Sequence, residues 1–120
     1  MTPDQGRSGT PDQVRGDERV ANPVRGEASF RVNGEALVLR PSFQALVAAE
    51  GELGPLFALV ERAADGRMTL AETAGLFWHC VAERPGWVTR EAVGEAVVAG
   101  GLAGATPVLR VLLGQILGGR

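Results

Sequence analysis

Apolar and polar residues alternate on both sides of Asn33-Gly34, which is the pattern of a β-hairpin. A type I′ turn at Asn33-Gly34 predicts the pairs Val32 with Glu35, Arg31 with Ala36, Phe30 with Leu37 and Ala28 with Leu39. One face then carries Ala28, Phe30, Val32, Leu37 and Leu39, and the other carries Glu27, Ser29, Arg31 and Arg40. Because a two-stranded ribbon is not stable by itself in water, we expect helices to cover its apolar face.

After Pro41 the apolar positions follow helical spacing, with a start signal before each run. Ser42 caps a helix from Phe43 to about Leu53, and Pro55 starts a second that closes at Asp65-Gly66. The residues expected on the inner side of the first helix are Phe43, Leu46, Val47 and Leu53. Thr69 and Glu72 form a capping box, which predicts a third helix from Leu70 to about Glu83.

Two more helices are expected near the C-terminus. Thr89 caps a helix with an inner stripe of Val93, Ala96 and Val97, and Gly100-Gly101 ends it. Thr106-Pro107 starts the last helix, which runs to about Leu117. The sequence therefore predicts an α+β fold that is mostly helical: an N-terminal two-stranded β-hairpin followed by a bundle of four to five short helices.

Residues 1–21 are rich in Pro, Gly, Asp and Arg and poor in apolar residues, so we expect a disordered N-terminal arm. Residues 22–120 are expected to form one small hairpin-plus-helices domain.

Composition narrows the class of protein. The net charge is −2 and no basic cluster stands out, which argues against nucleic-acid binding. The N-terminus lacks the apolar core of a secretory signal, and the apolar stretch 108–117 is interrupted and too short to cross a membrane. A single cysteine, Cys80, fits a reducing compartment. We expect a soluble cytoplasmic protein without a membrane partner.

No catalytic site is predicted. Adjacent helical residues point about 100° apart, so His79 and Cys80 do not form a nucleophile pair. No second His or Cys could complete a zinc site, and Gly100–Gly104 lacks the Lys and preceding strand of a phosphate loop. We expect no catalytic residue, metal or cofactor, and we expect the carboxylates of Glu50, Glu52, Glu61 and Asp65 to be simply solvated.

The last helix is apolar on nearly every side, so it is either buried all round or binds a partner. We expect Leu109, Leu112 and Ile116 to face the core, with Val111 and Leu117 exposed and Leu113 between them. Trp78 and Trp87 flank the Arg84-Pro85-Gly86 turn as core anchors or as a partner-facing patch, and both readings stay open here. The candidate partner-binding residues are Val111, Leu113, Leu117, Trp78 and Trp87.

The order of these devices is distinctive. Asn22-Pro23, Arg25-Gly26-Glu27, the hairpin and Leu39-Arg40-Pro41-Ser42-Phe43 are followed by Asp65–Thr69, Gly100-Gly101 and an Ala/Leu-rich terminal helix. From Asn22 to Gly119 the chain resembles the small tail-assembly protein of gene transfer agents, the phage-derived particles of α-proteobacteria.

This resemblance implies a non-enzymatic tail-assembly chaperone that binds the tape-measure protein during tail assembly. The tail-tube protein is a further candidate partner, and self-association stays open. The alternatives are a minor structural component retained in the tail and a generic helical protein-interaction domain. A DNA-binding regulator is disfavoured because no basic recognition helix is present.

Overall fold

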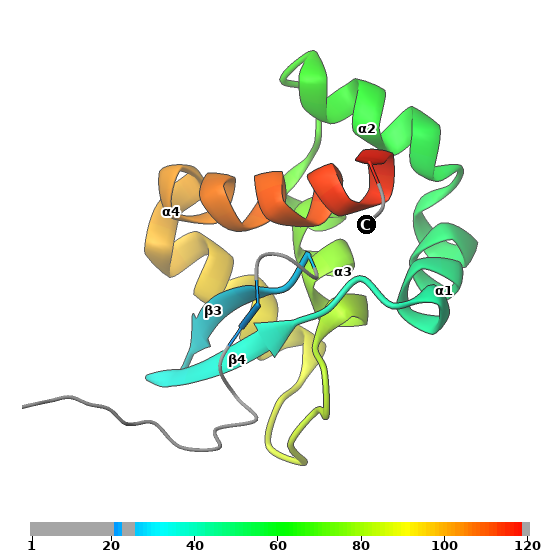
Figure 1. The fold of residues 1–120 in the computed structure, drawn as a ribbon. Coiled ribbons are helices and arrows are strands. Elements are labelled where there is room, and N and C mark those ends of the chain that lie inside the picture. Colours follow the sequence, from blue (N-terminus) through cyan, green and yellow to red (C-terminus); the bar gives the residue numbers. More distant parts are fainter. Residues whose placement is uncertain (1–20, 23–25, 119–120) are drawn as a thin grey trace, which may run out of the picture.

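The computed structural model describes residues 21–22 and 26–118. It contains strands β3 (Ala28–Val32) and β4 (Glu35–Leu39) and helices α1 (Phe43–Leu53), α2 (Leu56–Ala64), α3 (Leu70–Cys80) and α4 (Arg90–Gly118) (Figure 1). This arrangement confirms the mostly helical α+β fold, a two-stranded antiparallel hairpin followed by helices. The predicted arm falls almost wholly outside the described residues, so the division at residue 21 stays a prediction.

The hairpin has the predicted register. Val32 pairs with Glu35, Arg31 with Ala36, Phe30 with Leu37 and Ala28 with Leu39. Asn33 and Gly34 have φ values of 52° and 81°, as a type I′ turn requires. The apolar face is covered as expected, because β3 packs against α4 and the Phe30 ring meets Phe77 of α3 edge-on at 5.0 Å.

The core surrounds α3, which packs against α1 on one side and α4 on the other (Figure 1). The largest fully buried side chains come from β3, β4, α2, α3 and α4; they are Val32, Leu39, Leu59, Leu76, Phe77, Cys80, Val93, Val97 and Leu112. The predicted stripe of Val93, Ala96 and Val97 faces this core. Burial of these apolar side chains is the main source of stability.

The inner side of α1 was predicted only in part. Ser42 caps the helix by accepting from the Ala45 backbone N–H at 3.2 Å, and Leu46 and Leu53 pack against the core. Phe43 and Val47, however, are 84% and 51% exposed, so their placement on the inner side was wrong. The buried positions of α1 are Ala45 and Ala49, and their small side chains let α1 approach α3 closely.

Helix α3 begins at Leu70 with both hydrogen bonds of the predicted capping box, but it ends at Cys80 rather than near Glu83. The chain leaves the helix because Val81 forms a bridge with Leu39. The Arg40 N–H donates to the Cys80 carbonyl at 2.7 Å, and the Ala82 N–H donates to Val38 at 2.9 Å. The edge of β4 that does not pair with β3 thus binds backbone N–H and C=O groups that a longer α3 would use within the helix.

The segment of Val81 and Ala82 also lies against part of the hairpin face that was predicted to be polar. Val38 is 6% exposed there, and Glu27, which we placed on a polar face, is 2% exposed. Arg40 donates its Nε–H to Glu27 Oε2 at 2.6 Å. The ion pair satisfies a carboxylate that burial would otherwise penalise.

Helix α4 is bent where the sequence placed a helix end. Gly101 has φ 75° and ψ 164°, so Gly100-Gly101 does stop the first half. The predicted new start at Thr106-Pro107 was wrong, because the second half is already helical there and the Thr106 hydroxyl donates to the Leu102 carbonyl at 2.8 Å. Thr106 therefore bonds backward within the helix instead of capping it.

Among the described residues, α4 is long and apolar enough to cross a membrane by length and composition alone, since an 18-residue stretch of it has a mean hydropathy of 1.7. The bend at Gly101 divides it into two arms that run in different directions and pack over β3 and α3 (Figure 1). Helices α1 and α2, counted as one segment, are also long and apolar enough by the same measure, but their axes are bent by 77° relative to each other.

Candidate interaction surfaces

Large apolar side chains are exposed on every helix of the described chain. They are Phe43 and Val47 on α1, Phe57 on α2, Leu70 on α3, Trp87 in the loop before α4, and Val98, Leu102 and Leu117 on α4. Single exposed apolar residues are ordinary, but contiguous apolar surface rimmed by polar groups is typical of a binding site. A groove lined by such residues is therefore a candidate binding site.

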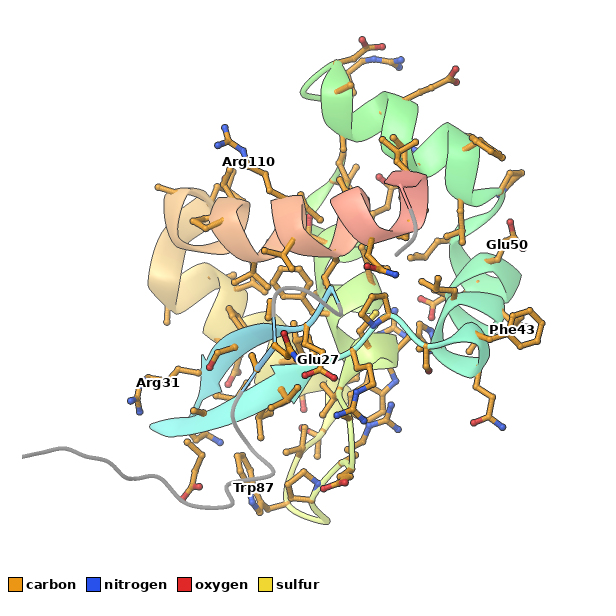
Figure 2. The ribbon with its side chains drawn as sticks, viewed as in Figure 1. Glu27, Arg31, Phe43, Glu50, Trp87 and Arg110 are labelled. Atoms are coloured by element: carbon orange, nitrogen blue, oxygen red, sulfur yellow. The ribbon has the colours of Figure 1, made fainter. Side chains whose placement is uncertain are left out.

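The predicted partner-binding residues are not gathered in one place. Trp87 lies at one end of the molecule, far from the C-terminal end of α4 that carries Leu117 (Figure 2). Leu117 is 61% exposed and Trp87 43%, whereas Val111 is half-buried. Leu113 and Trp78 pack against the core, and the Arg84 guanidinium lies 3.7 Å from the Trp78 ring centroid. Partner binding by these five residues stays a prediction.

The core side of the last helix is as predicted for two residues out of three. Leu112 is fully buried, and Leu109 packs against the core. Ile116 is half-buried and lies outside the main core cluster.

An apolar groove of about 520 Å³ runs between α3 and the first half of α4. Its lining consists of Leu70, Ala71, Ala74, Glu91, Gly94, Glu95, Val98 and Ala99. Sequence reasoning missed this groove. The only signal was the run of small residues at helical spacing on two helices, and the sequence does not show that these two runs face the same cleft.

A second groove, of about 750 Å³, lies between the hairpin turn and the bend of α4. The hairpin contributes Ser29, Arg31 and Asn33, and the bend contributes Gly100 and Gly101. Its lining mixes polar, apolar and glycine surface and points to no single ligand chemistry. Within Gly100–Gly104 the connection between the two helical halves is confined to the bend at Gly101, because Leu102, Ala103 and Gly104 already belong to the second half.

Glu52 is the centre of an ion-pair cluster, so the expectation of a simply solvated carboxylate was wrong there. Arg90 donates from Nη1 to Glu52 Oε1 at 2.7 Å and from Nη2 to Glu52 Oε2. His79 Nε2 lies 2.8 Å from Glu52 Oε1. The hydrogen bond from Arg90, and next that from His79, lowers the Glu52 pKa from 4.5 to about 2.

The other three carboxylates lie on the surface. Glu50 accepts from the Leu56 N–H at 3.1 Å, and Asp65 pairs with Arg67 at 2.9 Å between two exposed side chains. Glu61 is exposed.

Cys80 has the environment of a buried hydrophobe. Its side chain is 1% exposed, and burial raises the pKa of the thiol to about 12, which disfavours the reactive thiolate. The adjacent His79 pairs with Glu52 instead. Within the described residues, no group of three or more His, Cys, Asp or Glu side chains could hold a metal ion.

The fold is a small hairpin-plus-helices domain whose surface carries several large exposed apolar side chains. Residues 25–119 match the family described as "Phage tail tube protein, GTA-gp10", and this match covers most of the chain. The protein belongs to this phage tail assembly chaperone family, which is non-enzymatic. The match confirms the resemblance and the absence of enzymatic function. No curated protein and no solved structure matches.

Proposed function

We propose that this protein is a cytoplasmic tail-assembly chaperone that binds the tape-measure protein while the tail assembles. Family membership over residues 25–119 is the observation that carries the proposal. A tape-measure protein is a long apolar helical chain, and such a client needs its apolar stripes covered until tube subunits surround it.

The surface of the domain suits such a client. Exposed apolar side chains stand on rigid helices, and an amphipathic helix binds a hydrophobic groove through anchors at i, i+3, i+4 and i+7. Of the five residues proposed from the sequence, Leu117 and Trp87 could contact a client without any rearrangement, since both are exposed. Val111, Leu113 and Trp78 are half-buried, so each would offer a client less of its surface.

Co-expression with tape-measure fragments tests the proposal. We expect one or more fragments to become soluble and to co-purify with this protein at a fixed ratio. The matched control is the tail-tube protein expressed in the same way, which also tests it as a second partner. Tape-measure fragments that stay insoluble, or that are equally soluble without this protein, would contradict the proposal.

The family description, a phage tail tube protein, favours a second candidate function: a component retained in the tail. Quantitative mass spectrometry of purified particles separates the two. A chaperone is absent from the mature particle or present only in traces, whereas a tube or tail component is present in a fixed number of copies.

A further inference from the structure

The groove between α3 and α4 is shallow and open, and it is lined by small residues together with one larger apolar side chain from each helix. Ala74 and Gly94 face each other closely, since a Cβ added at Gly94 would lie 3.9 Å from the Ala74 Cβ. Leu70, 46% exposed, and Val98, 62% exposed, stand on opposite sides. A cleft between two packed helices with small residues at its floor lets a third helix approach closely.

Two carboxylates stand beside this apolar surface. Glu91 and Glu95 lie one helical turn apart on α4, and both line the groove. Both residues are exposed, and no hydrogen bond or ion pair joins either side chain to another residue in the described part of the chain. The groove therefore offers apolar contact flanked by negative charge on its α4 side.

We propose that this groove binds an α-helix of the tape-measure protein that carries Arg or Lys directly beside its apolar stripe. The apolar stripe lies between Leu70 and Val98, and the basic side chains pair with Glu91 and Glu95. Charge complementarity fixes the direction and register of the bound helix and speeds its encounter. The identity of the partner rests on the function proposed above, whereas the chemistry of the bound helix follows from the groove.

Two other occupants fit less well. Residues 1–20 have Met1, Val14 and Val20 as their only large apolar residues, which is too few for an apolar stripe. In a second copy of the chain, exposed Leu102 and Leu117 lie on the same helix as Arg110, but exposed Thr106 and Gly114 separate them. That face has a cation without a continuous stripe.

Three variants and two matched controls test the groove against soluble tape-measure fragments by isothermal titration calorimetry. Val98→Gln removes one of the two larger apolar side chains, Glu91→Gln with Glu95→Gln removes the charge, and Leu70→Gln removes the other apolar side chain. Val47→Gln is the control for Val98, because Val47 is also an exposed helical valine but lies on α1. Glu61→Gln with Asp65→Asn changes the net charge equally at sites outside the groove lining.

We expect each groove variant to weaken binding about tenfold and the controls to change it less than about twofold. We expect the affinity of the wild type to fall as NaCl is raised from about 0.05 to 0.5 M. The affinity of the Glu91→Gln/Glu95→Gln variant should depend much less on salt, because its groove lacks the two charges. Circular dichroism melts test whether each variant is folded. We expect all of them to be folded, because substitutions of exposed side chains cost little stability.

Each remaining outcome overturns a different statement. If the wild type binds and all groove variants bind equally well, the groove inference is wrong and the proposed function stands. If control and groove variants weaken binding alike, the client binds exposed apolar surface in general, and the assignment of its site to this groove is wrong. If the wild type binds no fragment, the proposed function fails as well. A dimer that Val98→Gln dissociates would assign the groove to a second copy of the chain.

Discussion

Arg90, the first residue of α4, binds both carboxylate oxygens of Glu52, which lies one residue before the end of α1. The two residues are 38 positions apart, and the guanidinium reaches the carboxylate past Gly75 of α3. A Cβ at Gly75 would lie 2.9 Å from Arg90 Nη2, so a larger residue would displace this ion pair. One interaction thus ties the three helices α1, α3 and α4 together.

The Glu52 ion pair makes stability depend on pH. Because the folded pKa of about 2 is below the ordinary value of 4.5, the pair stabilises the fold above pH 4.5, and this contribution is lost as pH falls toward 2. The Glu52 side chain is 37% exposed, so solvent screening limits its contribution to roughly 1 kcal/mol.

We therefore expect Glu52→Gln to be less stable than wild type at pH 7 by about 1 kcal/mol and to lose most of this deficit, though not all of it, by pH 2.5. Urea denaturation at a series of pH values measures this difference, and Glu61→Gln is the control because Glu61 is an exposed carboxylate on α2. A deficit that stays constant down to pH 2.5 would contradict the assignment of the pKa shift to this pair.

Gly75→Ala should have opposite effects in two backgrounds. Alanine favours the helix interior by about 1 kcal/mol over glycine, but its Cβ would displace Arg90 and press on Leu53 Cδ2 at 3.3 Å. With Arg90→Ala already in place, we expect Gly75→Ala to stabilise α3 by about 0.5–1 kcal/mol. In the wild-type background the gain should disappear or reverse.

A double-mutant cycle from chemical denaturation measures this coupling. The free energies of Gly75→Ala and Arg90→Ala should differ from additivity by at least about 0.5 kcal/mol, as for residues in direct contact. Additive effects would mean that Arg90 does not depend on the open space at Gly75.

The sequence predicted the elements that depend on neighbouring residues. The turn at Asn33-Gly34 depends only on the positive φ angles that these two residues adopt. Ser42 and Thr69 cap their helices by accepting from backbone N–H groups three positions later. Such signals need no knowledge of distant parts of the chain. The register of the hairpin follows directly from its turn, which is why all four predicted pairs are correct.

The errors came from contacts between distant segments. Both stripes of α1 are apolar, so spacing could not decide between Phe43 with Val47 and Ala45 with Ala49. Helix α3 ends early because Val81 pairs with Leu39, which is 42 positions earlier by numbering. The α3–α4 groove depends in the same way on how two helices pack, which periodicity in either helix does not reveal.

The hairpin turn gives a sharp test of the register. Asn33→Val with Gly34→Val should destabilise the domain by at least about 2 kcal/mol, because each residue must keep a positive φ that β-branched side chains resist. A Cβ at Gly34 would meet no atom within 4 Å, so this cost comes from the backbone and not from crowding.

Thermal and urea denaturation measure the loss. Asn33→Gly is the matched control, and we expect it to change stability by less than about 0.5 kcal/mol since glycine accepts the same φ. Wild-type stability in the double valine variant would show that the turn can change type without disturbing the fold.

Leu112 and Leu117 test the two sides of the last helix. Leu112 is fully buried, so Leu112→Ala should cost about 2–5 kcal/mol as a cavity in the core. Leu117 is 61% exposed, and Leu117→Ser should cost no more than about 0.5 kcal/mol. Adding Val111→Ser should cost more, about 1 kcal/mol, because Val111 is half-buried.

The same variants separate stability from binding. If this side of the helix contacts the tape-measure protein, Val111→Ser with Leu117→Ser weakens co-purification of a tape-measure fragment while the domain stays folded. Leu112→Ala should lower the stability of the domain but leave co-purification unchanged at temperatures where the variant is still folded. The reason is that the Leu112 side chain is 0% exposed and cannot touch a partner. Melting curves and co-purification must be measured on the same preparations. If Val111→Ser with Leu117→Ser unfolds the domain, the helix contributes to the core on this side too, and Trp87, 43% exposed at the other end of the molecule, becomes the next residue to replace.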